Sequence, residues 1–384
     1  MKPLSKTVQS IAPSGIRRFF DIVNTMQDVL SLGVGEPDFA TPWRIREACI
    51  YSLEHGHTHY TSNYGMLELR QAISDHLSKR EGIFYNPENQ LLITVGVSEG
   101  MDLAMRAILN PGDEVIVPEP CFVSYKPCVL FAGGKPVVVP TCEANGFVAR
   151  PEEIRAAITD KTKAILLGYP ANPTGAVAPR ELLEEIVRIA CEFDLYIISD
   201  EIYGRLTYEG KHTCIPTLPG AYERTILLDG FSKAYAMTGW RIGYAAGSPE
   251  IIETMMKIHQ YTMMCASTMS QVAAIEAIRN SDRECEEMVE QYNHRRRVIV
   301  KGLNDIGLPC LMPKGAFYAF PSIKHLGLSS DEFCERLLFE EKVAVVPGSA
   351  FGECGEGYIR CSYATSLDKI NQALERMQRF VAKL

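Results

Sequence analysis

Residues 228–244 read Leu-Asp-Gly-Phe-Ser-Lys-Ala-Tyr-Ala-Met-Thr-Gly-Trp-Arg-Ile-Gly-Tyr and contain one lysine, Lys233, shortly after an apolar run. Lys233 follows the small hydroxyl residue Ser232, and a second cation, Arg241, stands further along the same stretch. Most lysines are exposed to solvent, and by itself this residue would carry no function. Burial and a neighbouring cation would lower the pKa of its amine and free the lone pair for nucleophilic attack. Lys233 is therefore the first candidate for chemistry.

Two further motifs precede this stretch. Ser-Asp-Glu-Ile-Tyr occupies 199–203, and Asn-Pro-Thr-Gly occupies 172–175. Taken alone, Asp200 is typical of a cap or turn after a buried strand, Tyr203 is typical of a core, and the second motif is a turn. Each motif is weak, but their combination and order are specific.

In this order, the motifs resemble those of the class I/II aminotransferases, which are pyridoxal-phosphate enzymes of fold type I. The resemblance extends from Gly33 to Arg360. Within the family, the chain is most similar to bacterial aspartate- and aromatic-type enzymes, including enzymes thought to act on N-acetyl-diaminopimelate.

Size and charge limit the classes of partner. A chain of 384 residues suits two packed α/β lobes. Its net charge of -8 argues against nucleic acid, because phosphate backbones require clustered cations. The basic run at 294–297 is expected to lie on a solvated helix face. No apolar run reaches the ~18 residues of a membrane span, so no membrane partner is expected.

Cysteine and histidine usage predicts neither disulfides nor metal. The twelve cysteines contain no C-x-x-C pair. A chain this long can build a core without disulfides, so free thiols in a reducing cytoplasm are expected. Three histidines alternate in His55-Gly56-His57-Thr58-His59, but no nearby cysteine or carboxylate completes a ligand set.

Short apolar runs alternate with amphipathic stretches through the middle of the chain. Helices are expected at 99–109, after Phe122 and at 180–191. The expected strands are 91–95, 114–117, 136–139, 164–167, 196–199, 225–228 and 242–246. This pattern favours a largely parallel sheet covered by helices on both faces. A Rossmann fold is set aside, because the glycines at 33–35 and 96–100 lack the G-x-G-x-x-G spacing.

The pattern changes near residue 250 to long helices, which continue to about Ile306, and 315–384 reads as a smaller α+β lobe. With the resemblance, this predicts fold type I: a large domain with a mostly parallel seven-stranded sheet at 46–285. A small domain would comprise 1–45 and 286–384. Residues 15–24 are expected to pack on the C-terminal lobe.

The resemblance implies a catalytic role for three residues. Lys233 would hold the pyridoxal 5'-phosphate aldehyde as a Schiff base, then carry a proton between substrate Cα and cofactor C4′. Asp200 would pair with the pyridine nitrogen and keep it protonated. Tyr203 would donate to the phenolic oxygen of the cofactor, a task shared with Asn172. A cis peptide bond is expected before Pro173 and also before Pro120.

The cofactor phosphate requires backbone N–H groups at a helix N-terminus, hydroxyls and a cation. Gly96, Val97 and Ser98 fit by their position between a strand and a helix. Ser232 and Arg241 resemble the other family ligands. The position three residues before the lysine is often serine in this family, but here it is Gly230.

The homodimer expectation rests on Tyr60. In the family, the matching tyrosine reaches the phosphate of the neighbouring subunit. The resemblance therefore implies a homodimer with shared active sites.

Other residues would contact the ring and the substrate. Phe122 matches the aromatic that stacks on the pyridine ring. Arg360 matches a bidentate clamp for the substrate α-carboxylate, and Gly35 would let the backbone approach the same group. There is no clear arginine for a distal carboxylate. Ile16, with Arg17 and Arg18, is a substrate-binding candidate if the N-terminal segment closes over the site.

The sequence thus predicts an aminotransferase with a ping-pong cycle, in which an L-amino acid gives its amino group to the cofactor and a 2-oxo acid, 2-oxoglutarate, then takes it. The apolar segment 259–264 favours aromatic substrates, followed by aspartate and N-acetyl-diaminopimelate. A C–S β-lyase on the same scaffold stays open. A non-catalytic cofactor-binding regulator is the third class, although the chain shows no added DNA-binding domain.

Overall fold

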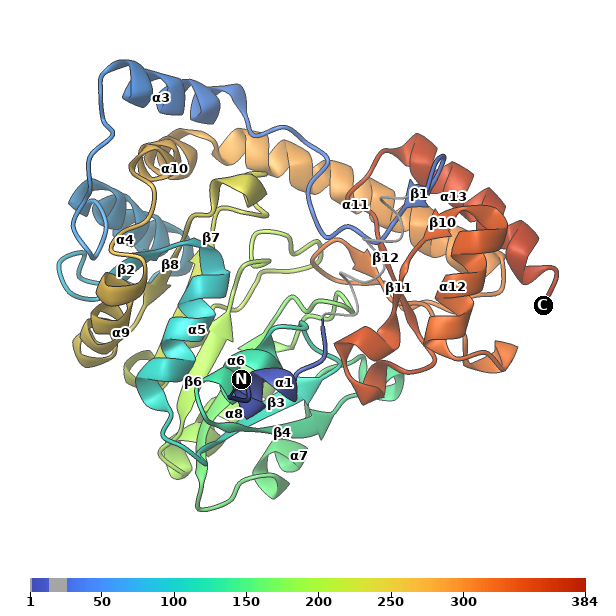
Figure 1. Ribbon diagram of the computed structural model, residues 1–384, viewed down its shortest axis with the longest axis horizontal. Coiled ribbons are helices and arrows are strands. Elements are labelled where there is room, and N and C mark those ends of the chain that lie inside the picture. Colours follow the sequence, from blue (N-terminus) through green and yellow to red (C-terminus); the bar gives the residue numbers. More distant parts are fainter. Residues whose placement is uncertain (1, 14–25) are drawn as a thin grey trace.

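The computed structural model describes residues 2–13 and 26–384 and has a seven-stranded sheet at its centre (Figure 1). The strand order is β2-β8-β7-β6-β5-β3-β4. The bounds are β2 Leu91–Thr94, β3 Glu114–Glu119, β4 Lys135–Pro140, β5 Thr162–Gly168, β6 Tyr196–Asp200, β7 Thr225–Gly230 and β8 Gly243–Ala246. All neighbours from β7 to β4 are parallel, and β8 is antiparallel to both β7 and β2. The predicted strands and the mostly parallel sheet are confirmed.

Helices cover both faces of the sheet because its strands are apolar on both sides. Along β6, Ile198 packs with α5 (Gly96–Ile108), α6 (Tyr125–Phe131) and α9 (Pro249–Thr262). Its neighbour Ile197 points to the opposite face and packs with α7 (Pro151–Ala156) and α8 (Arg180–Glu192). This alternation follows from the two-residue period of a strand.

The expected change near residue 250 is confirmed, since α9, α10 (Thr268–Asn280) and α11 (Asp282–Asp305) follow one another. The prediction that residues 294–297 lie on a solvated face is wrong in part. Arg295 and Arg296 are buried on the inner side of α11. Their charges are paired, with Arg295 2.7 Å from Asp38 and Arg296 2.9 Å from Glu209, so the helix ties distant segments to the core.

A smaller α+β part completes the chain. Strand β12 (Ile359–Ser362) lies between β11 (Val346–Pro347) and β9 (Tyr318–Ala319) in an antiparallel sheet. Strand β1 (Leu30–Ser31) pairs in parallel with β10 (Val343–Ala344), so residues 30–31 lie beside this part. Helix α13 (Leu367–Val381) packs beside α11, and α12 (Ser330–Glu341) packs against α13 (Figure 1). The expected packing of residues 15–24 lies outside the described residues.

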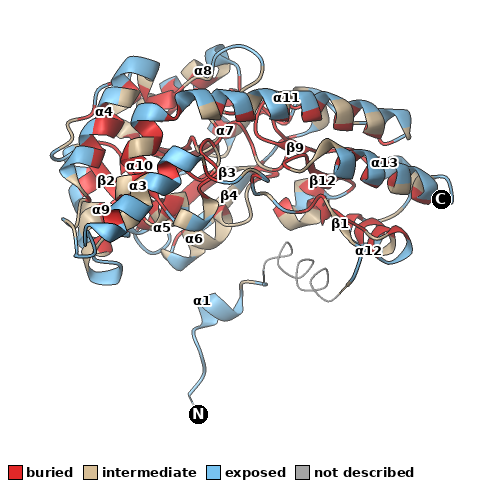
Figure 2. Cartoon of the chain, turned by 90° about the horizontal axis from the view of Figure 1, so that it is seen from above, coloured by how far each residue is buried: buried red, intermediate tan, exposed pale blue. Residues whose placement is uncertain are grey.

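Three further described helices precede the strands of the large sheet in the sequence: α1 (Lys6–Gln9), α3 (Trp43–Glu54) and α4 (Leu67–Glu81). Figure 2 shows α1 at the periphery of the molecule, where its residues are exposed although it touches α6. The inner sides of α3 and α4 are buried. In the part of the chain that the structure describes, no helix has both the length and the apolar character needed to cross a membrane. All twelve cysteines lie there as free thiols.

Candidate active site

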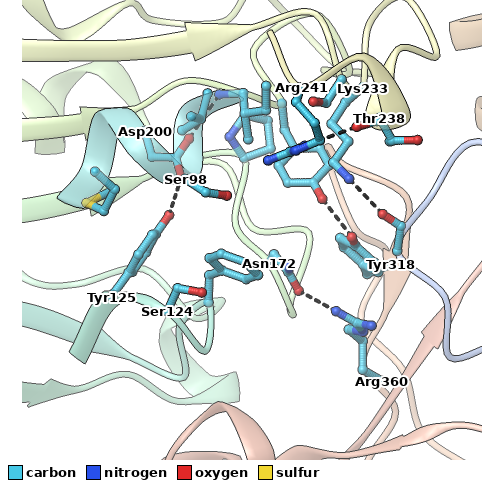
Figure 3. Close-up of a pocket in the computed structure, with 18 residues that line it drawn as sticks. Ser98, Ser124, Tyr125, Asn172, Asp200, Lys233, Thr238, Arg241, Tyr318 and Arg360 are labelled. Carbon is cyan, nitrogen blue, oxygen red and sulfur yellow. Dashed lines mark hydrogen bonds between the residues drawn. The ribbon is translucent and has the colours of Figure 1, made fainter. Parts of the chain in front are cut away.

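A cavity of about 310 Å³ lies at the carboxyl ends of β5, β6 and β7, beside the start of α5 (Figure 3). Ligands of open α/β sheets bind at this edge. Side chains from the small antiparallel sheet close its other side. The lining residues are Gly35, Val97, Ser98, Met101, Phe122, Ser124, Tyr125, Pro170, Asn172, Asp200, Ile202, Tyr203, Ser232, Lys233, Thr238, Arg241, Tyr318 and Arg360. Most of the sequence-predicted residues are therefore brought together.

Lys233 reaches the cavity from the turn that follows β7. Its Nζ donates a hydrogen bond of 2.7 Å to the Gly35 carbonyl oxygen. Burial lowers the pKa of this amine to about 8, Glu36 opposes the shift, and Arg360 and Arg241 add to it. A larger share of the amine is therefore neutral near pH 7 than for an exposed lysine, as a nucleophile or proton acceptor requires.

Asp200 ends β6 and is buried against Tyr125. The Tyr125 hydroxyl donates to Asp200 Oδ2 at 2.8 Å, and the Ile202 N–H donates to Oδ1 at 3.2 Å. Burial raises the pKa of Asp200 to about 6, and these two hydrogen bonds oppose the shift. A buried carboxylate held this way favours a cationic ligand atom beside it.

Tyr125 was not predicted as a site residue. The signal available in the sequence was its position three residues after Phe122, where α6 begins. The two rings meet edge to face with centroids 5.7 Å apart. The sequence does not indicate that the start of α6 directs the Tyr125 side chain toward Asp200.

Tyr318 is a second residue that the sequence reasoning missed. Its hydroxyl lies 2.6 Å from that of Tyr203. The Arg360 guanidinium carbon lies 4.4 Å from the centroid of the Tyr318 ring (Figure 3). A Cβ atom at Gly35 would lie 2.4 Å from the Tyr318 hydroxyl. Glycine is therefore required at position 35 because the backbone there lies close to Tyr318.

Arg360 is buried in the middle of β12. Its Nη1 donates to Asn172 Oδ1 at 2.9 Å, and its Nη2 donates to the Gly33 carbonyl at 2.7 Å. Among the described residues, its Nε has no hydrogen-bond partner and no carboxylate pairs with its charge. A buried unpaired cation is costly, so the site is suited to an anionic ligand.

The start of α5 forms a second part of the cavity that is suited to an anion. Its N-cap residue is Val95, and no side chain caps the helix. The first N–H groups of a helix have no partner within it, so those of Gly96–Ser98 are available to a ligand. Arg241 approaches so closely that a Cβ at Gly96 would lie 2.8 Å from its Nη2. Ser232 lines the same cavity.

Gly230 departs from the serine common in the family, and packing explains the departure. A Cβ atom here would lie 2.9 Å from the Gly243 Cα. A Cβ at Gly243 would in turn lie 2.9 Å from the Val97 nitrogen. The end of β7, the start of β8 and the turn into α5 thus touch through backbone, which leaves no room for a side chain.

The other predicted residues have varied positions. Phe122 lines the cavity. Tyr60 is 81% exposed and does not line it. Ile16, Arg17 and Arg18 lie outside the described residues. The peptide bonds before Pro120 and Pro173 are cis as predicted, and the bond before Pro170 is also cis, which was not predicted.

Comparison with known proteins agrees with this geometry. Residues 27–377 match the sequence profile of the family Aminotransferase class I and II. The chain is 48% identical to the aspartate aminotransferase of Pyrococcus abyssi, over 98% of this chain and 97% of that protein. It is 46% identical to aromatic-amino-acid aminotransferase 2 of Thermococcus litoralis, over 98% and 97%. The structure of Thermus thermophilus aspartate aminotransferase with maleate superposes with a TM-score of 0.95 at 41% identity, covering 99% of this chain and all of that one.

Proposed function

This chain belongs to the class I and II aminotransferases, and we propose that Lys233 is the residue through which it transfers amino groups. The chain is a transaminase of fold type I that acts on amino acids and 2-oxo acids. The observation that carries the proposal is the convergence of Lys233, Asp200 and Arg360 on one cavity. An amine, a buried carboxylate and a buried unpaired guanidinium have no purely structural reason to meet there.

Pyridoxal 5'-phosphate fits the cavity at each of its functional groups. When bound, this cofactor supplies a ring that accepts the electron pair left on the substrate Cα after deprotonation. Asp200 would pair with the pyridine nitrogen, and its burial is consistent with a cationic partner. Gly96, Val97 and Ser98 would bind the phosphate with Ser232 and Arg241.

Two residues would hold the phenolic oxygen. Asn172 Oδ1 already accepts from Arg360, which leaves its Nδ2 free to donate to that oxygen. Tyr203 can donate to the same oxygen while it accepts from the Tyr318 hydroxyl. Phe122 would cover the ring.

Lys233 would move the proton. Its lowered pKa makes the amine competent to take a proton from the substrate Cα and to return it on the neighbouring cofactor carbon. The buried position of the side chain keeps bulk water from competing for this proton.

Substrate binding would rest on Arg360, whose planar fork suits an α-carboxylate. The described lining residues include three cations, Lys233, Arg241 and Arg360, and each has a role already. No described lining cation is left for a distal carboxylate, which supports aromatic amino acids first, aspartate second and N-acetyl-diaminopimelate third. 2-Oxoglutarate is the proposed acceptor, and Ile16 is kept as a candidate contact.

We also propose a homodimer of two-domain subunits with shared sites. Tyr60 is 81% exposed, as expected for a side chain that a second copy would cover, and it would reach the partner's phosphate. The domain boundaries, 46–285 against 1–45 with 286–384, stay a prediction, because α11 runs continuously across residue 285. The free thiols suit the cytoplasm as its compartment.

The deciding experiment is absorption spectroscopy of the purified protein with pyridoxal 5'-phosphate and single amino acids, in the absence of any oxo acid. We expect a lysine-dependent visible band that each good donor converts stoichiometrically to the pyridoxamine form. Lys233→Ala should lack both the band and turnover. Without a Lys233-dependent band, the proposed role of this residue falls.

The same experiment distinguishes transamination from the alternative C–S β-lyase activity. The similarity to aminotransferases does not favour the lyase. A β-lyase would release pyruvate and ammonia from cystathionine while the band persisted. We expect neither product, and their appearance without band conversion would replace transamination by elimination.

A further inference from the structure

We infer that Glu99 and His259 are positioning residues for phosphate binding, although neither lines the cavity. This inference rests on the proposed binding of pyridoxal 5'-phosphate. It concerns the phosphate turn, defined as residues 95–98, which comprises the N-cap residue Val95 and the first three residues of α5. Val97 and Ser98 of this turn line the cavity, and Glu99 follows them directly on α5.

Glu99 binds the phosphate turn from behind. Its Oε2 accepts a hydrogen bond of 2.5 Å from the Val95 N–H. The carboxylate thus satisfies the N–H of the N-cap residue and leaves the following N–H groups, at Gly96–Ser98, to the cavity. If the Glu99 side chain turned away, Val95 would lose this partner and the turn could rotate.

His259 fixes the other oxygen of the same carboxylate. It lies on α9, which packs against α5, and its Nδ1 is 2.6 Å from Glu99 Oε1. Because Nδ1 faces a carboxylate oxygen, it carries the hydrogen. The ring is fully buried, and its Nε2 has no partner among the described residues. Burying an imidazole whose Nε2 has no partner costs free energy. This cost suggests that the hydrogen bond from Nδ1 to Glu99 has a function.

Backbone packing restrains the phosphate turn from its other sides. Gly243 packs directly beneath the Val97 nitrogen, and the Arg241 guanidinium lies against Gly96. The Thr94 hydroxyl also donates to the Gly96 carbonyl oxygen at 3.0 Å. The Glu99–His259 pair adds a restraint on the Val95 N–H through two side chains. Without it, we expect the turn to lose the orientation of its N–H groups rather than to unfold.

The test compares the dissociation constants of pyridoxal 5'-phosphate and of pyridoxal, which lacks the phosphate. Both form the same bond with Lys233, so their ratio isolates the phosphate contribution. Apoprotein would be titrated with each ligand while the visible band is followed. Glu99→Ala and His259→Leu should each lower the wild-type preference for the phosphorylated ligand about tenfold, within the range of helix-terminus interactions with anions.

Two controls separate positioning from general damage. Glu99→Gln keeps an acceptor for Val95 and should retain most of the preference. Asp102→Ala removes an acid one turn further along α5, where it pairs with Arg106 at 2.9 Å, and should leave the preference unchanged. If His259→Leu does not fold, Glu99→Ala decides the same question, because its side chain lies nearer the surface.

The outcomes distinguish the two proposals. Folded Glu99→Ala and His259→Leu proteins with the wild-type preference would overturn the positioning role alone. A wild-type protein that forms no lysine-dependent band with either ligand would overturn the proposed cofactor itself.

Discussion

At the scale of the residue, the burial of Asp200 suits its proposed pairing with the cofactor but lowers the stability of the folded protein. Burial raises its pKa to about 6 from an ordinary 3.8. The folded protein without cofactor therefore binds this proton more tightly than the unfolded chain does. A group of this kind lowers stability as the pH rises from about 4 to about 6. The carboxylate is thus poorly solvated until a cationic ligand arrives.

Asp200→Asn should stabilise the cofactor-free protein while it reduces turnover. The amide carries no charge, and the Tyr125 hydroxyl can rotate to accept from it. We expect the free energy of unfolding at pH 8 to rise on the order of 2 kcal/mol over wild type, with the gain absent below about pH 4. Urea unfolding at both pH values measures this, and equal pH dependence in the two proteins would contradict it. Turnover should fall more than cofactor affinity.

Tyr125→Phe should change the pH profile instead. The Tyr125 hydroxyl lowers the Asp200 pKa, so its removal should raise that pKa and move the acid limb of kcat to higher pH. The alkaline limb should keep its place. The matched control is Tyr292→Phe, which removes a buried hydroxyl that has no hydrogen-bond partner among the described residues. Coincident profiles for Tyr125→Phe and wild type would rule out this coupling.

At the scale of the element, close backbone contacts among β7, β8 and the first turn of α5 shape the proposed phosphate site. The end of β7 meets the start of β8 at Gly230 and Gly243, and β8 meets the first turn of α5. A larger residue at Gly230 or Gly243 would push β7, β8 and α5 apart. These segments together position Arg241 and the N-terminus of α5. The absence of a family hydroxyl at position 230 is therefore compatible with a complete site.

Gly230→Ser restores the residue common in the family and should nevertheless be unfavourable. Its Cβ would lie 2.9 Å from the Gly243 Cα, where backbone must shift. We expect a loss of about 1–3 kcal/mol in the free energy of unfolding, as for other overpacked sites. Gly239→Ser is the control, because a Cβ there has nothing within 4 Å. A Gly230→Ser protein as stable as this control would show that the strands yield freely.

At the scale of the whole molecule, the cavity lies between the large sheet and the small antiparallel sheet. Lys233 and Asp200 come from the first, whereas Tyr318 and Arg360 come from the second. Movement of one part against the other would therefore change the distance between the amine and the carboxylate clamp. The proposed second subunit adds Tyr60 to this arrangement.

Complementation between inactive variants tests the shared site. Lys233→Ala and Tyr60→Ala proteins should each have low activity, for different reasons. Unfolded together and refolded, they should recover about a quarter of wild-type activity, because random pairing gives half mixed dimers with one intact site each. Refolding each variant alone is the control. A mixture no more active than its components would contradict a site shared between copies.

The strands, the sheet type and most of the residues that line the cavity could be predicted from local sequence. Strands such as 196–199 are visible because a continuous apolar run between turn signals is a local property, and hydrophobic burial acts on it in any context. Lys233, Asp200 and Asn172 were found because each lies in a short contiguous motif. The predicted boundaries differ by one to three residues at several elements; α5, for example, begins at Gly96 rather than at Glu99.

Contacts between residues far apart in the chain could not be predicted from local sequence. Tyr125 and Tyr318 carry no motif of their own, and their roles come from contacts with Asp200 and Tyr203 across 75 and 115 residues of chain. The inward turn of Arg295 and Arg296 also depends on partners far away in sequence. Local sequence sets backbone periodicity, but the direction of a polar side chain is decided by whichever partner the folded chain brings within hydrogen-bonding distance.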